Sequence, residues 1–144
     1  MKIWIIDDEF NFREQAKEQI KKIDKKCKIF ESDHFNWPPD FLKIKKMKKQ
    51  DFPDLVILDL FKEKIFADPK GTYFYFNLRE QERKVFGKAV VPVILWSIAY
   101  NATEKVENLI TRIDDKDHLF TYTEMKSQGE LSDYLKEIIK AKDY

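Results

Sequence analysis

Glycine is scarce in this sequence, which has only three glycines among its 144 residues. A glycine-rich loop of the kind that cradles nucleotide phosphates is therefore nearly excluded. The single cysteine, Cys27, cannot form a disulfide within the chain, and we expect it to be a buried thiol. No apolar run approaches the ~18 residues of a membrane-spanning helix, and no signal peptide is visible. We therefore expect a cytoplasmic protein that does not bind a membrane.

Net charge is also nearly absent, because 27 lysines and arginines face 26 aspartates and glutamates, for a formal charge of +1. That balance argues against a protein dedicated to binding nucleic acid or a membrane surface. Apolar residues make up 43% of the chain, and its length suffices for one domain with a substantial core. We expect residues 1–144 to form that single domain.

The hydrophobic pattern centres on residues 55–58, an unbroken Leu-Val-Ile-Leu run typical of a parallel strand buried on both faces. Residues 2–6 and 90–96 are also apolar, whereas the strands expected at 28–31 and 119–123 are mixed. Apolar residues at helical spacing predict a helix after each strand, around residues 12–23, 41–49, 72–86, 101–113 and 127–138.

Five strands alternating with five helices predict an α/β fold with a parallel sheet covered by helices on both faces. Central strands are covered on both faces, so the first, third and fourth strands belong in the middle. The doubly wound strand order 2-1-3-4-5 satisfies this requirement. In such folds the ligand site lies outside the carboxyl ends of the strands, where the winding reverses.

Acidic and hydroxyl side chains follow the three central strands. Asp7 and Asp8 end the first strand, Asp59 ends the third and Ser97 ends the fourth. The predicted fold gathers these groups in one shallow pocket. Two carboxylates about 4 Å apart repel by about 4 kcal/mol at an effective dielectric constant of 20, which favours either a raised carboxyl pKa or a bound divalent cation. Mg²⁺ suits oxygen ligands at a solvent-facing rim, and a carboxylate can itself act as a nucleophile that forms an acyl phosphate.

Residues 5–9, 53–59 and 91–97 together resemble the receiver domain of two-component response regulators, and the resemblance extends over nearly the whole chain. The three motifs stand in the right order at the right strand ends. The resemblance implies a flavodoxin-like three-layer sandwich. It also implies that the aspartate of the third strand takes a phosphoryl group from the phosphohistidine of a sensor kinase.

The resemblance assigns a role to each residue of the predicted pocket. Asp59 would accept the phosphoryl group. Asp8 and Asp59 would bind Mg²⁺ directly, together with the backbone carbonyl of Phe61, and Asp7 would act through water. Ser97 would bind a phosphoryl oxygen and draw its loop inward.

Receiver domains also have a lysine at the end of the fifth strand, usually followed by proline. Lys126 is the candidate here, although no proline follows it. With Lys126 as that lysine, Thr123 stands three residues before it, where a switch aromatic is expected. Counting back from Leu131 without gaps instead places Glu124 at the lysine position. Both registers stay open at this point. They bear on the output switch more than on the phosphorylation chemistry.

The resemblance implies protein partners: a sensor histidine kinase or phosphotransfer protein as donor, and a downstream target, with no direct nucleic-acid binding. Such a domain is not an enzyme beyond its own phosphorylation and dephosphorylation. One alternative is a receiver-like interaction module that no longer signals by phosphorylation. Another is a Mg²⁺-dependent phosphatase with Asp59 as nucleophile, but Phe61 occupies the position where that chemistry needs a second aspartate.

Overall fold

The computed structural model of the chain describes residues 1–33, 48–59, 70–97, 121–125 and 131–142. Five parallel strands form one sheet in the order β2-β1-β3-β4-β5, as predicted. The strands are β1 (Lys2–Ile6), β2 (Lys28–Ser32), β3 (Leu55–Leu58), β4 (Val93–Ser97) and β5 (Thr121–Met125). The helices are α1 (Phe10–Ile23), the 3-10 helix η2 (Lys49–Asp51), α3 (Lys70–Phe86) and α5 (Ser132–Lys142).

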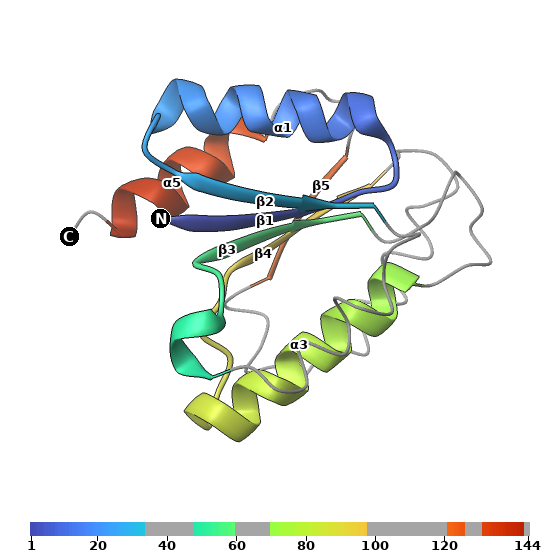
Figure 1. The fold of residues 1–144 in the computed structure, drawn as a ribbon, viewed down its shortest axis with the longest axis vertical. Helices are drawn as coiled ribbons and strands as arrows, with labels where there is room; N and C mark the ends of the chain where they lie inside the picture. Colours follow the sequence, from blue (N-terminus) through green and yellow to red (C-terminus); the bar gives the residue numbers. More distant parts are fainter. Residues whose placement is uncertain (34–47, 60–69, 98–120, 126–130, 143–144) are drawn as a thin grey trace.

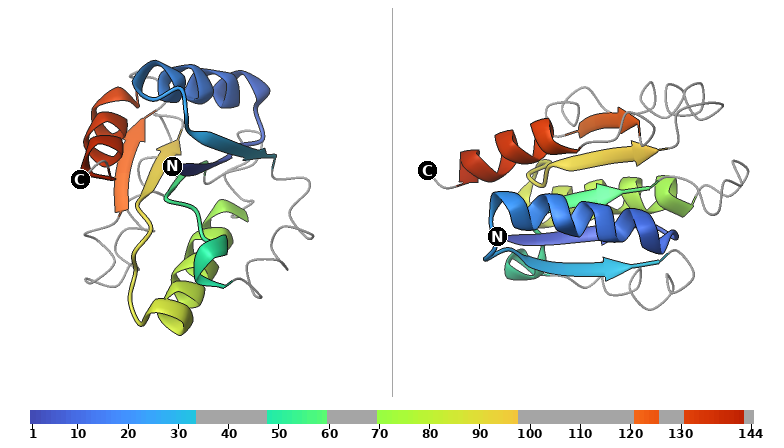
Figure 2. Two further views of the ribbon diagram at one scale, coloured as in Figure 1. Left: turned by 60° about the vertical axis from the view of Figure 1, so that its left-hand side comes forward. Right: turned by 90° about the horizontal axis from the view of Figure 1, so that it is seen from above.

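The helices lie on both sides of the sheet, which confirms the flavodoxin-like three-layer arrangement. Helices α1 and α5 cover one face and α3 covers the other (Figure 1). All five strands run in the same direction, so their carboxyl ends share one edge (Figure 2). None of the helices in the described part of the chain has the length and apolar character needed to cross a bilayer.

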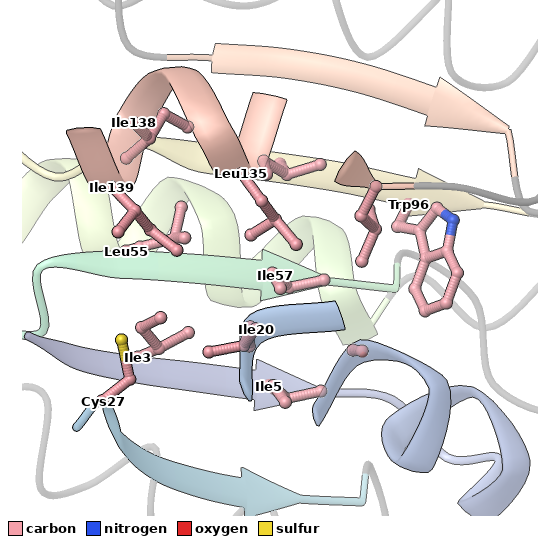
Figure 3. Close-up of a cluster of buried hydrophobic side chains, with 13 residues drawn as sticks. Ile3, Ile5, Ile20, Cys27, Leu55, Ile57, Trp96, Leu135, Ile138 and Ile139 are labelled. Atoms are coloured by element: carbon pink, nitrogen blue, oxygen red, sulfur yellow. The ribbon is translucent and has the colours of Figure 1, made fainter. Parts of the chain in front are cut away.

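The two faces of the sheet carry separate cores, because successive residues of a strand point to opposite faces. In β1, Ile3 and Ile5 belong to the core beneath α1 and α5, whereas Ile6 belongs to the core beneath α3. Cys27 is buried in the first core, as predicted, and desolvation raises its pKa. Figure 3 shows how the central strands meet the two helices there, through Ile20, Leu55, Ile57, Trp96, Leu135 and Ile138.

The predicted bounds of two strands were wrong by two residues or more. Strand β4 begins at Val93 rather than at residue 90, because the N–H groups of Val90 and Val91 donate to the Glu82 carboxylate and Pro92 has no N–H. Strand β5 covers Thr121–Met125 rather than residues 119–123, in the register that pairs it with β4.

The helix predictions were correct in part. Helix α3 begins at Lys70, two residues before the predicted start, and it ends before Gly87, whose φ of 80° suits glycine. The predicted helices at 41–49 and 101–113 lie outside the described residues, apart from Lys48 and Lys49. Lys49 opens η2. The first residues of the helix predicted at 127–138 also lie outside, and α5 begins at Ser132.

A fully buried ion pair joins α3 to the segment that leads into β4. Arg79 and Glu82 are both 0% exposed, and Arg79 Nη1 donates to Glu82 Oε1 at 2.8 Å. The same Nη1 donates to the Val91 carbonyl at 2.8 Å, and Nε donates to the Tyr75 hydroxyl at 3.2 Å. Glu82 Oε2 accepts the N–H groups of Val90 and Val91. Each charge is thus both paired and hydrogen-bonded, as a buried charge requires.

We predict that Arg79→Met lowers the free energy of unfolding by about 3–5 kcal/mol, because it leaves the Glu82 carboxylate buried without its cation. Urea denaturation measures this change. The control is Lys84→Gln on the same helix, which breaks the exposed Lys84–Glu80 pair and should cost less than about 1 kcal/mol. Equal costs for the two variants would contradict a stabilising role for the buried pair.

Candidate functional site

Asp7 is the first residue after β1. Its N–H donates to the Ser32 carbonyl at 3.1 Å, which extends the pairing of β1 with β2 by one hydrogen bond. Asp7 is only 2% exposed, and its Oδ1 accepts the N–H of Glu9 at 2.9 Å. An aspartate that accepts a backbone N–H two residues on forms an Asx turn, so Asp7 itself shapes the turn into α1.

Asp59 is placed in the same way on the neighbouring strand. Its N–H donates to the Ile6 carbonyl at 2.8 Å and so continues the pairing of β3 with β1 beyond Leu58. Asp59 is 4% exposed. Because Ile6 and Leu58 are register partners, the residues that follow them, Asp7 and Asp59, leave the sheet side by side.

The carboxylates of Asp7, Asp8 and Asp59 meet at this edge. Each offers an oxygen, and these oxygens all lie within 4.8 Å of one another. The prediction that the strand ends bring these three side chains together is therefore confirmed. Like charges this close repel one another strongly, and a cation between them offsets the repulsion. An all-oxygen set with one half-buried member, Asp8, fits Mg²⁺, which keeps water in its remaining coordination positions.

The other predicted site residues are placed in part or not at all. Ser97 is the last residue of β4, so its backbone lies at the same carboxyl edge, opposite Met125 of β5. Phe61 and Lys126 lie outside the described residues. Glu124 is paired with Trp96 and therefore lies within β5 rather than after it.

The sequence analysis did not single out Arg13, which contacts the turn at Asp7, or Glu31, which Arg13 also binds. Arg13 Nη1 donates to the Asp7 carbonyl at 2.8 Å, and Arg13 Nε donates to Glu31 Oε1 at 3.1 Å. The arginine thereby ties α1 to the end of β1 and to the edge strand β2. No sequence pattern reveals this contact, because the partners are 6 and 18 positions away and lie on other elements.

Lys17, one turn further along α1, binds the same carboxylate. Its ammonium forms ion pairs with Glu31 and with Glu14. The hydrogen bond from Lys17 and that from Arg13 hold the pKa of Glu31 below its usual value. The hydrogen bonds to Glu14 and Glu31 raise the pKa of Lys17. The carboxylate of Glu31 is therefore ionised at neutral pH and bridges two cations of one helix.

Comparisons with known proteins fit this geometry. No protein-family model matches the sequence, and no curated protein does. Solved structures match over the whole chain. The signal receiver domain of a DNA-binding response regulator from Colwellia psychrerythraea is 17% identical, with a TM-score of 0.59 over 100% of this chain and 99% of that one. This chain has the fold of a response-regulator receiver domain.

Two further receiver-fold neighbours are informative through their bound or modified states. The response regulator TrrA from Thermotoga maritima, solved with Mg²⁺ and BeF, is 20% identical with a TM-score of 0.56, over 97% of this chain and 96% of that one. The phosphorylated cyanobacterial phytochrome response regulator RcpA is 15% identical with a TM-score of 0.59, over 96% and 91% of the two chains. The receiver fold of this chain is therefore shared with proteins solved in both of those states.

The ion pairs of Glu31 make stability depend on pH. Since folding lowers the pKa of Glu31, its contribution to stability is present above the pKa of an unfolded-state glutamate and is lost as pH falls through the lower folded-state pKa. We predict that the free energy of unfolding of wild type exceeds that of Glu31→Gln by less than about 1 kcal/mol at neutral pH, since the ion pairs of Glu31 are part-exposed. Urea unfolding between about pH 7 and pH 2 should show this difference closing in acid.

The control for this titration is Glu80→Gln, whose carboxylate pairs with Lys84 on the exposed side of α3. The difference in free energy of unfolding between Glu80→Gln and wild type should stay small over the whole pH range. A difference between wild type and Glu31→Gln that persists or grows in acid would contradict the assignment.

Proposed function

We propose that this chain is a receiver domain of two-component signal transduction that accepts a phosphoryl group on Asp59 in a Mg²⁺-dependent reaction. The observation that carries the proposal is the meeting of the Asp7, Asp8 and Asp59 carboxylates within 4.8 Å at the carboxyl edge of a receiver fold. The states of the neighbours support it, since TrrA was solved with Mg²⁺ and BeF and RcpA was solved phosphorylated.

The acidic residues would hold the metal, and Asp59 would also be the nucleophile. Asp8 and Asp59 would hold Mg²⁺ directly, with the backbone carbonyl of Phe61, and Asp7 would act through water. Bound Mg²⁺ supplies neutralising charge for the phosphoryl oxygens. The N–H, the carbonyl and the carboxylate of Asp7 each form a hydrogen bond within the protein, so its position is fixed before any ligand binds.

The proposed chemistry is one transfer from a phosphohistidine to an aspartate. A carboxylate oxygen of Asp59 attacks phosphorus, the phosphorus–nitrogen bond breaks, and the imidazole leaves with the electron pair while an acyl phosphate forms. Ser97 would donate its hydroxyl to a phosphoryl oxygen. Lys126 would bind another oxygen, and the strand register favours Lys126 over Glu124 because β5 ends at Met125.

The acyl phosphate would act as a switch through charge. By analogy with hydroxyl phosphorylation it carries about −1.5 to −2 charges, which favour inward positions of Ser97 and Lys126. A near-complete switch needs about 5.5 kcal/mol of differential stabilisation. The donor would be a sensor histidine kinase or phosphotransfer protein in the cytoplasm, and the output would be binding to a downstream protein. The domain would turn over no substrate other than its own phosphoryl group.

Incubation with Mg²⁺ and acetyl phosphate tests the proposal. We predict a mass gain of about 80 Da in wild type, the addition of one phosphoryl group, and its complete loss in Asp59→Asn. Intact-mass spectrometry measures both. The matched control is Asp54→Asn, which removes a carboxylate at the opposite end of β3, where it accepts the Lys2 N–H at 2.7 Å. No gain in wild type would overturn the proposal and favour a module that binds without phosphorylation.

Removal of the metal gives an independent test. We predict that Mg²⁺ at about 100 times its dissociation constant stabilises wild type by about 2.7 kcal/mol relative to the chelated protein. Asp8→Asn should weaken Mg²⁺ binding by about tenfold or more, because it removes one charged oxygen ligand. Thermal unfolding across a MgCl₂ series measures both effects. Identical Mg²⁺ responses of wild type and Asp8→Asn would contradict the ligand assignment.

A further inference from the structure

We propose that Arg13 is a positioning residue for the metal-binding carboxylates, because its guanidinium fixes the peptide unit that joins Asp7 to Asp8. The inference rests on the proposed function, since it concerns the same Mg²⁺ site. Arg13 touches neither the phosphoryl group nor the metal in this scheme. Its contact is with main chain, through the 2.8 Å hydrogen bond from Nη1 to the Asp7 carbonyl.

The planarity of the peptide bond is the first step of the argument. The Asp7 carbonyl and the Asp8 N–H belong to one rigid plane, so a group that holds the carbonyl also sets where the Asp8 backbone lies. The Asp7 N–H and Oδ1 are already bonded to Ser32 and Glu9. The bond from Arg13 adds a third restraint, and it acts on the peptide unit between two of the three clustered carboxylates.

The guanidinium is itself held in place, which is the second step. Only 14% of the Arg13 side chain is exposed, and its Nε donates to Glu31 Oε1. Lys17 binds the other oxygen of Glu31. Arginine presents several donors in a fixed plane, so it can serve the Asp7 carbonyl and the Glu31 carboxylate at once. The edge strand β2 thereby braces the turn through Arg13.

The direction in which Mg²⁺ affinity changes when Arg13 is replaced separates a positioning role from a purely electrostatic one. As a nearby positive charge, Arg13 repels Mg²⁺, so a neutral replacement would tighten binding on electrostatic grounds. As a positioning residue, it aligns the ligands, so the same replacement weakens binding. Outer partners of metal ligands commonly affect affinity by about 10–100-fold.

The experiment compares Mg²⁺ affinities of wild type, Arg13→Gln, Arg13→Lys and Lys17→Gln by calorimetric titration with MgCl₂ at constant ionic strength. Circular dichroism checks that each variant is folded at the temperature used. We expect Arg13→Gln to weaken binding by about tenfold or more. Arg13→Lys, which retains charge and most of the stem, should also stay weaker than wild type because an ammonium lacks the planar fork.

Lys17→Gln is the matched control. It removes one positive charge from the same helix and the same Glu31 carboxylate but leaves the bond to the Asp7 carbonyl intact. Its affinity should equal or slightly exceed that of wild type.

Three outcomes would overturn the inference. If Arg13→Gln binds Mg²⁺ as tightly as wild type or more tightly, Arg13 does not position the site. If Lys17→Gln weakens binding as much as Arg13→Gln, the effect belongs to the ion-pair network and not to the Asp7 carbonyl. If wild type itself binds no Mg²⁺, the proposed function fails first and this inference fails with it.

Discussion

The pairing of β1 with β3 is the constraint on which the candidate site depends. Ile6 and Leu58 are register partners, and the N–H of Asp59 donates to the Ile6 carbonyl immediately beyond them. This single bond past the end of β3 brings a residue of one strand beside a residue more than fifty positions away. A one-residue slip would turn every side chain of β3 to the opposite face and separate Asp59 from Asp7.

The register is secure because the central strands are apolar on both faces. Leu55 and Ile57 pack into the core under α1 and α5, whereas Val56 and Leu58 pack into the core under α3. Burial of each such side chain contributes about 1.5–3 kcal/mol, and a slipped strand would have to repack both cores. The stability of two cores therefore opposes the mutual repulsion of three carboxylates at the sheet edge.

Arginine–glutamate pairs brace the structure at both ends of the sheet, in two different settings. At the amino edge, Arg79 and Glu82 are fully buried and connect α3 to the start of β4. At the carboxyl edge, Arg13 and Glu31 are part-exposed and connect α1 to β1 and β2. In both pairs the guanidinium also donates to a main-chain carbonyl. A planar cation with several donors can satisfy a carboxylate and a carbonyl together, which a lysine cannot do with fixed geometry.

Sequence alone was enough for the architecture and for the three acidic residues, because local hydrophobic pattern identifies buried strands and the topology of parallel sheets brings their carboxyl ends together. The predicted start of β4 was wrong because the carboxylate of Glu82, eight and nine positions away, accepts hydrogen bonds from the N–H groups of Val90 and Val91. Arg13 was missed for a related reason. Which carbonyl or carboxylate a long polar side chain reaches depends on elements that become neighbours only after the sheet has formed, and no local pattern contains that information.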